Sequence, residues 1–273
     1  IAPIPMDFDV LYLIVNGTLA PGQEAFTGEF DGKDPVTQIN HTISNWNYVT
    51  NTDQVVGLFS TVSGTVKNLN IRNFSVNFST PAISSPFFAV GGLAGMVLSG
   101  GTVASVSFDQ SSEVVAASSL NNGVIGSLIG LVSGATLSSI SATLNSDSAV
   151  RGPASAQVGG LIGSVSDFFG GGVSADHLSI TANGLTLEGA SIEGGLIGMV
   201  DSGSATSNFD TISVVLNDVS FTAPDASRVG GFTGVLRSEV SSGGSVTVNH
   251  ITVEVNGSSQ ISAGVDSDVA GMI

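Results

Sequence analysis

The sequence predicts an all-β protein: a parallel β-solenoid, in the form of a three-sided β-helix, of about six coils of ~35 residues with an N-terminal cap. Three observations predict this fold. The composition is rich in glycine and poor in charge, a segment containing Gly-Gly recurs at a regular interval, and a strand-like segment follows each recurrence.

The composition is that of an ordered chain rich in strands. Of 273 residues, 36 are glycine, 42% are hydrophobic and 10% are charged, and the mean hydropathy is +0.41. A disordered chain shows the opposite balance, and a collagen needs glycine at every third position. Val, Ile, Thr and Phe are plentiful while the helix formers Lys, Glu, Gln and Arg are scarce, which favours strands.

The charge balance excludes several classes of partner. With 22 acidic and 6 basic residues the net charge is −16, so no basic face is available for nucleic acid or for anionic membrane surfaces.

Cysteine is absent, which rules out disulfides and thiolate catalysis. The most apolar stretch, 86–98, is shorter than the ~20 residues of a membrane span and contains three glycines. We expect an extracellular or cell-surface protein without membrane insertion.

The regular interval becomes visible when the Gly-Gly segments are aligned on the large apolar residue that follows the glycines. These marker residues are Leu58, Leu93, Leu128, Leu161, Leu196 and Phe232. Their spacings are 35, 35, 33, 35 and 36 residues, and a period this regular is typical of a solenoid. The fullest form of the marker segment reads V-G-G-L-I-G.

Two further strands are predicted in each coil. The first contains two apolar residues separated by one polar residue, the period-2 pattern of a strand with one buried face. Its apolar pairs are Leu69 and Ile71, Val106 and Phe108, Ile140 and Ala142, Leu178 and Ile180, Ile212 and Val214, and Ile251 and Val253. A weaker strand follows at 113–115, 185–187 and 260–262. Three strands separated by Gly, Ser and Asn turns describe one coil, and each coil buries its apolar face against its neighbours.

The glycines of the marker segment are predicted to be structural, because they let the backbone turn sharply or approach another backbone. The dinucleotide-binding pattern G-x-G-x-x-G is not matched, since the spacing is G-G-x-x-G and no helix is predicted after it. Two coils depart from the pattern: Ser127 replaces a glycine and Glu193 replaces the preceding valine.

The two ends of the chain differ from the middle. Residues 1–54 lie outside the Gly-Gly register, include an apolar strand at 10–15 and the only tryptophan, Trp46, and are predicted to form a cap. Residues 55–273 are predicted to be solenoid repeats, the last of which begins at 269–273 and is incomplete. An open coil can accept a strand from another chain. The residues expected to take part in self-association are Val10, Leu11, Leu13, Val15, Val269, Met272 and Ile273.

The sequence resembles the GLUG repeats of bacterial surface and secreted proteins. The resemblance lies in 26–32 (FTGEFDG), 42–45 (TISN), 56–59 (VGLF) and 64–69 (GTVKNL), followed by the later G-G-L-x-G segments. It covers most of the chain. It implies a large adhesin or cell-surface module in which the repeats form a scaffold, and it implies no catalytic residues.

No catalytic constellation is evident. The histidines are His41, His177 and His250, and the last two occupy the same place in their repeats, where other coils have Asn, Ser or Thr. Such a position is predicted to face solvent. The sequence contains no G-x-S-x-G elbow and no HExxH, Walker or EF-hand motif. We therefore predict no enzyme activity, no cofactor and no metal.

Closely spaced carboxylates are the remaining candidates for chemistry. They form the pairs Asp7 and Asp9, Glu29 and Asp31, and Asp266 and Asp268. An i, i+2 pair on a strand places both groups on one face, as carbohydrate-cleaving sites require; a solvated strand edge or turn is the simpler interpretation. The last pair is also a weak candidate for Ca²⁺.

Five N-x-S/T sequons, at Asn16, Asn40, Asn73, Asn77 and Asn256, are possible sites of N-glycosylation in a host that modifies Asn.

Three functions are compatible with these features. The first is an extracellular structural or adhesive solenoid, a filament, stalk or surface-layer subunit that self-associates as a homo-oligomer or homopolymer. The second is a protein that binds or cleaves polysaccharide, with a glycan or host-surface ligand. The third, ice binding, would need ranks of Thr on one face, and the outward positions instead mix Ser, Asn, Thr, His and Asp.

Overall fold

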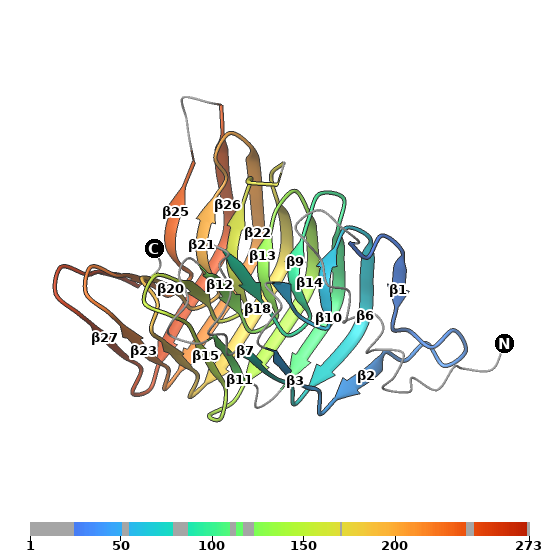
Figure 1. The fold of residues 1–273 in the computed structure, drawn as a ribbon, viewed down its shortest axis with the longest axis horizontal. Helices are drawn as coiled ribbons and strands as arrows, with labels where there is room; N and C mark the ends of the chain where they lie inside the picture. Colours follow the sequence, from blue (N-terminus) through green and yellow to red (C-terminus); the bar gives the residue numbers. More distant parts are fainter. Residues whose placement is uncertain are drawn as a thin grey trace.

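The protein is a parallel β-solenoid. The computed structural model describes residues 25–50, 55–78, 87–109, 113–116, 123–169, 171–238 and 243–271. In these residues all regular structure is β-strand, and the strands pair in parallel into sheets that run along the solenoid axis (Figure 1). The prediction of an all-β solenoid of about six coils is confirmed.

The longest strands form one sheet, which we call the long-strand sheet. Its order is β1-β6-β10-β14-β18-β22-β26, and β2 also pairs with β6. The strands are β1 (Glu29–Asp31), β2 (His41–Ser44), β6 (Thr65–Arg72), β10 (Thr102–Asp109), β14 (Thr136–Leu144), β18 (Ser174–Asn183), β22 (Thr206–Asn217) and β26 (Ser245–Asn256). They lengthen from 8 to 12 residues between β6 and β26, so the coils widen toward the C-terminal end.

A second sheet follows the long strands in each coil, and we call it the short-strand sheet. Its strands are β3 (Asn47–Thr50), β7 (Ser75–Phe78), β11 (Glu113–Ala116), β15 (Ala149–Arg151), β19 (Thr186–Glu188), β23 (Ser220–Ala223) and β27 (Gln260–Ala263). It contains the third strand predicted from the sequence.

The marker segment, expected as one strand, is two strands joined at a bend, so each full coil has four strands instead of three. The strands before the bend form the entry sheet: β4 (Val55–Val56), β8 (Phe88–Val90), β12 (Gly123–Gly126), β16 (Gln157–Gly159), β20 (Ile192–Gly194), β24 (Arg228–Gly230) and β28 (Asp268–Ala270). Those after it form the exit sheet: β5 (Phe59–Val62), β9 (Ala94–Val97), β13 (Ile129–Val132), β17 (Ile162–Ser166), β21 (Ile197–Asp201) and β25 (Thr233–Arg237).

The glycines create this bend by bringing the two sheets into backbone contact. A β-carbon on Gly159 would lie 1.8 Å from the carbonyl oxygen of Ile162 and 2.7 Å from the nitrogen of Gly198 in the next coil. A β-carbon on Gly163 would lie 2.4 Å from the nitrogen of Ile125 in the previous coil. Side chains at these positions would therefore push the entry and exit sheets apart.

The middle glycine of the motif lets one coil lie directly on the next. A β-carbon on Gly160 would lie 2.1 Å from the carbonyl oxygen of Gly195. Ser127, which occupies the same place, is fully buried, and its hydroxyl donates a hydrogen bond to the carbonyl oxygen of Gly160. The departure from glycine in this coil is thus accommodated by a bond between coils.

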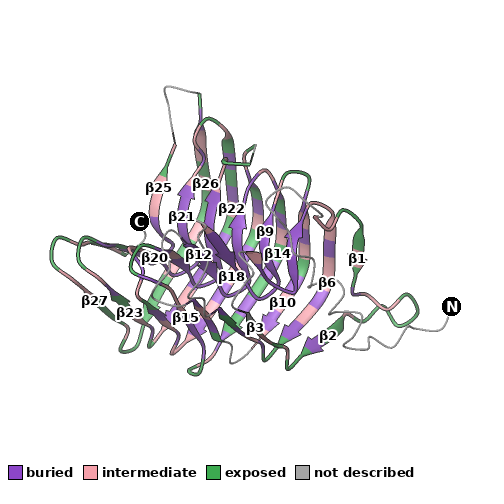
Figure 2. Ribbon diagram, in the orientation of Figure 1, coloured by how far each residue is buried: buried purple, intermediate pink, exposed green. Residues whose placement is uncertain are grey.

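The core consists of inward side chains that stack from coil to coil. The predicted apolar pairs are in register along the long-strand sheet, with Leu69 paired to Val106, then Ile140, Leu178 and Ile212. All five are at most 1% exposed. Figure 2 shows this buried interior in purple, with exposed residues in green on β1, β2 and β27 at the two ends.

A column of left-handed residues divides each long strand in two. Its members have φ between +48° and +56°: Asn68, Ser105, Ser139, His177, Thr211 and His250. Each of these residues is left out of the pairing between neighbouring strands. The backbone is kinked there, and the inward residues on either side of the kink, such as Val66 and Leu69, both point into the core. Asn tolerates this conformation, whereas it is strained for β-branched Thr.

Part of the region expected as a cap forms a coil of the same kind. β1 pairs with the first half of β6, β2 with its second half, and β3 with β7, all in parallel. The segment 32–40 is inserted between β1 and β2 at the level of the left-handed column. Phe26 and Phe30 pack on Phe59 of the next coil, with ring centroids 5.1 and 5.6 Å away.

Candidate functional site

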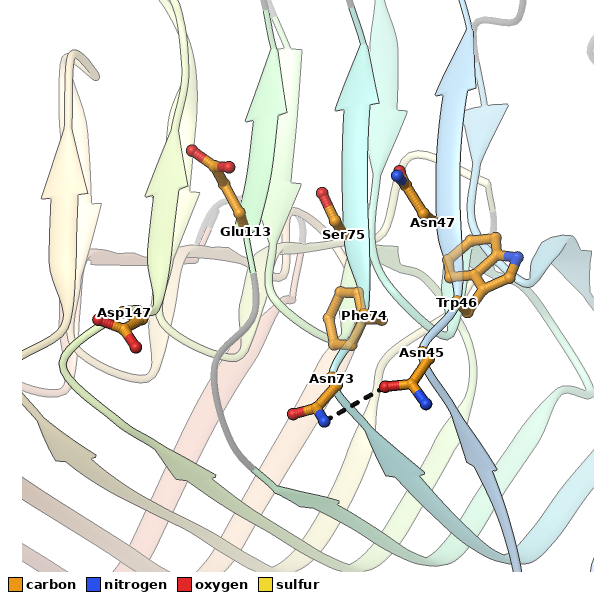
Figure 3. Close-up of a pocket in the computed structure, with 8 residues that line it drawn as sticks. All are labelled: Asn45, Trp46, Asn47, Asn73, Phe74, Ser75, Glu113 and Asp147. Carbon is orange, nitrogen blue, oxygen red and sulfur yellow. Dashed lines mark hydrogen bonds between the residues drawn. The ribbon is translucent and has the colours of Figure 1, made fainter.

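A shallow pocket of about 340 Å³ lies at the corner between the long-strand and short-strand sheets, near the N-terminal end (Figure 3). The turn residues of successive coils form part of its wall. Asn45 joins β2 to β3 and Asn73 joins β6 to β7, and both have positive φ. The pocket is lined by Asn45, Trp46, Asn47, Asn73, Phe74, Ser75, Glu113 and Asp147.

The pocket combines an aromatic ring with amides and carboxylates. The half-buried Trp46 stacks on Tyr48, with ring centroids 5.8 Å apart and an interplanar angle of 6°, and lies 6.5 Å from the Phe74 ring. The amide nitrogen of Asn73 donates to the amide oxygen of Asn45 at 3.4 Å (Figure 3). An indole face beside amide and carboxyl groups suits a ligand that has both apolar C–H faces and hydroxyl groups.

One carboxylate of this pocket takes part in an ion-pair ladder. Arg151 contacts Glu113 at 2.7 Å and Glu188 at 2.8 Å, so a single guanidinium bridges carboxylates from the coils on either side. The side chains are partly exposed, so each pair contributes only a few tenths to about 1 kcal/mol. The ladder places Glu113 beside a guanidinium whose single positive charge is shared by two carboxylates.

The three histidines lie at the surface in separate places. His177 and His250 have exposed side chains, as predicted, and each contacts an aspartate: Nδ1 of His177 lies 2.7 Å from Asp176 and Nδ1 of His250 lies 2.6 Å from Asp210. The hydrogen bond from His250 lowers the pKa of the Asp210 carboxyl. His41 lies 3.9 Å from Asp34 in the inserted segment.

The carboxylate pairs within the described residues contact basic side chains. Glu29 and Asp31 do share one face, where Lys67 contacts them at 2.8 and 3.4 Å. The Asn68 side chain, the Lys33 N–H and Lys67 lower the pKa of Asp31.

In the last pair, Asp266 lies in a turn with φ of +58° and Asp268 lies in β28, 3.7 Å from Arg228. Asp7 and Asp9 lie outside the described residues. Within the described part of the chain, no three His, Cys, Asp or Glu side chains form a group that could hold a metal ion.

The sequon asparagines differ in their surroundings. Asn73, Asn77 and Asn256 are exposed and Asn40 is half-buried, while Asn16 lies outside the described residues. The amide nitrogen of Asn256 donates to Asn217 at 3.0 Å, and Asn217 donates to Asn183 at 2.8 Å. A glycan on Asn256 would interrupt this ladder of asparagines.

The coil at the C-terminal end leaves its inward side chains uncovered. Val255, Ile261 and Val269 are 55%, 44% and 52% exposed. Their partners in the preceding coil are Leu216, Phe221 and Val229, which are 1%, 3% and 2% exposed. Of the residues predicted to self-associate, Val269 lies on this edge; Val10, Leu11, Leu13, Val15, Met272 and Ile273 lie outside the described residues.

The Trp46 pocket was not apparent as a site in the sequence, whereas the edge that contains Val269 was predicted there as a place of self-association. The described residues include no helix that could cross a membrane. Comparison of the chain with protein-family models, with curated proteins and with solved structures gives no match.

Proposed function

We propose that the protein is an extracellular structural or adhesive β-solenoid, a filament, stalk or surface-layer subunit, that self-associates by strand addition. The observation that carries the proposal is the uncovered C-terminal edge of β26, β27 and β28. Its inward apolar side chains are about half exposed, and no described strand pairs with the outer side of these three strands, which is an edge of the kind that templates pairing with another chain.

Several further features support this function. The resemblance to GLUG repeats favours a bacterial surface or secreted protein. A surface of Ser, Thr, Asn and Gly with a net charge of −16 suits a protein that stays soluble outside the cell. Every copy has the same edge, and in strand addition this edge pairs with a different surface of the next copy. Such a contact is heterologous, and because it does not close on itself it extends into filaments. Residues 10–15 are the predicted strand donor.

The uncovered edge is tested by placing a charge on it. Val269→Lys points a cation inward at the edge, as natural solenoids and sheets do to block association. We expect sedimentation velocity to show self-association weakened about tenfold or more, because an unpaired charge would have to be buried in the contact. Deletion of residues 1–16 should have the same effect if they donate the strand.

Ser141→Lys is the matched control, since it adds the same charge to an exposed position in the middle of the long-strand sheet. It should leave association unchanged. Equal association of all variants, at unchanged circular dichroism, would contradict strand addition at this edge.

A second candidate, binding of polysaccharide without cleavage, is favoured by the Trp46 pocket. Trp46→Ala removes the aromatic face and should weaken retention on an array of bacterial and plant polysaccharides about tenfold, given the ~0.5–1.5 kcal/mol of an aromatic contact beyond its buried area. Val36→Ala, which shortens an exposed apolar side chain outside the pocket, is the control. Retention by Trp46→Ala equal to that of the unaltered protein would rule out this pocket.

A further inference from the structure

The entry and exit sheets enclose a groove on the outside of the solenoid. The marker bend turns the outer faces of the two sheets toward one another, and the glycines let their backbones touch at its base. Farther from the glycines, the outward residues of both sheets face across this space. We call it the outer groove and define it by the outward residues of β4, β8, β12 and β16 on one wall and of β9, β13, β17 and β21 on the other.

The groove is apolar although its side chains point away from the solenoid core. Ala89, Met96, Val124 and Leu131 form a hydrophobic cluster separate from the main core and are 0–5% exposed. Val55, Phe87 and Leu98 pack against this cluster. Outward positions of a solenoid usually carry polar residues, as they do on the long-strand sheet. The four apolar residues of the cluster point away from the main core, so packing in that core does not explain them.

The groove contains a cavity of about 350 Å³, within the ~300–1,000 Å³ of small-molecule sites. Phe168 and Phe169 stand beside it in the segment after β17, their rings 4.9 Å apart and nearly perpendicular. Phe168 is 80% exposed.

The two rings are held in place by their backbone. The N–H of Phe169 donates to Oγ of Ser133 in the preceding coil at 3.1 Å, and the N–H of Phe168 donates to Oγ of Ser166 at 3.2 Å. The carboxylate of Asp167 accepts from the N–H of Ser204 in the following coil at 2.8 Å. The aromatic pair is thus fixed at the cavity by bonds to both neighbouring coils.

One wall of the cavity changes from apolar to polar at the fourth coil. Gln157 stands where the preceding coils have Val55, Ala89 and Val124, and across the groove Ser164 follows Leu131 in register. Oε1 of Gln157 is buried and has no hydrogen-bond partner among the described residues. A buried acceptor left unsatisfied is destabilising, and the soft terminal torsion of Gln allows the amide to turn toward a ligand.

The described lining of the cavity is uncharged. It includes no Lys, Arg, Asp or Glu, so none of these residues would neutralise a carboxylate or phosphate, and the net charge of −16 disfavours anions further. A largely apolar trough with polar groups at the level of the fourth coil therefore selects an uncharged molecule with a long apolar part and one hydrogen-bond donor.

We propose that the outer groove binds an uncharged aliphatic chain with a terminal hydroxyl, whose O–H donates to Oε1 of Gln157. The chain lies along Val55, Met96, Val124 and Leu131, with Phe168 and Phe169 beside it. A methylene occupies slightly less than the ~30 Å³ of a water molecule, so the cavity accommodates a chain of roughly ten to twelve carbons.

The probe is 1-decanol, titrated into the intact protein by isothermal calorimetry. We expect saturable binding to one site. The methyl ether of the same chain lacks the donor and should bind about tenfold more weakly, the effect of one hydrogen bond of ~1.4 kcal/mol. Decanoate at pH 8 should bind still more weakly, because its charge would be desolvated without a partner.

Two variants and a control complete the test. Gln157→Val installs the residue type of the first and third coils and should abolish the preference for the alcohol over the ether while leaving the fold intact. Val55→Trp fills the groove from its half-buried rim and should reduce binding more than tenfold, whereas Val36→Trp, in the exposed segment 35–37, should not. Absence of saturable binding, equal affinity for alcohol and ether, or binding unaffected by Val55→Trp would each overturn the proposal.

Discussion

Replacement of Glu193 by Val is expected to stabilise the protein and to remove most of the loss of stability that accompanies a rise in pH from 4.5 to 8. Glu193 is fully buried and pairs in register with Val158 and Val229, both core residues. One carboxylate oxygen accepts from the N–H of Ala190 at 3.2 Å, and the other has no partner among the described residues. Valine would restore the apolar layer of the neighbouring coils.

The direction of the pH effect follows from the pKa. Burial raises the pKa of the Glu193 carboxyl from 4.5 to about 8; the Ala190 N–H opposes this shift and the Glu188 charge adds to it. Because the folded state holds the proton more tightly than the unfolded state, the stabilisation is complete below pH 4.5 and is lost as the pH rises to 8. At ~1.4 kcal/mol per pKa unit, the loss is on the order of 3–5 kcal/mol.

Urea denaturation of the unaltered protein and of Glu193→Val, followed from pH 5 to pH 9, measures this effect. The free energies of unfolding should diverge as the pH rises. Glu254→Gln, which removes an exposed carboxylate on β26, should follow the unaltered protein. Parallel curves for Glu193→Val and the unaltered protein would show that Glu193 is not a buried neutral acid.

Replacement of Gly159 by Ala is expected to destabilise the protein strongly. The added β-carbon would overlap the carbonyl oxygen of Ile162, and it would also press on the nitrogen of Gly198 in the next coil. Both are backbone atoms, which no side-chain rotation can relieve. We expect a loss of about 3 kcal/mol or more, at or above the upper range for overpacking, measured as the change in the free energy of unfolding.

Gly271→Ala is the matched control, because a β-carbon there meets no atom within 4 Å. It should change stability by less than about 0.5 kcal/mol. If both substitutions had the same small effect, the close contact of the entry and exit sheets would be wrong.

The sequence was sufficient to predict the class of fold. The spacing of the six marker residues gave the coil length, and the apolar pairs such as Leu178 and Ile180 are the buried positions of β18. The marker glycines had been interpreted as positions of a sharp turn or close approach. Gly159 lies at the bend where the entry and exit sheets touch, and Gly160 lies where one coil approaches the next. The sequence could not divide the marker segment into two strands, because its short apolar run is compatible with one straight strand.

The candidate sites could not be derived from the sequence because they join residues ~35 positions apart through the register of the coils. Gln157 faces an apolar groove only because β16 pairs with β12 and bends back on β17. The left-handed column, of which His177 is a member, depends on a backbone kink that residue type alone does not reveal, since Asn, Ser, Thr and His share it. A signal was available in Phe168 and Phe169, two adjacent aromatic residues before three glycines; in the other adjacent pair, Phe88 is in the core and Phe87 packs against the groove cluster.

The central proposal, that the uncovered C-terminal edge joins one copy to another, is tested most directly by negative-stain electron microscopy of the purified protein over a range of concentrations. We predict rods whose lengths are multiples of one solenoid, joined end to end, and shorter on average for Val269→Lys than for Ser141→Lys. Single solenoids at every concentration, or rods of equal length for the two variants, would contradict it.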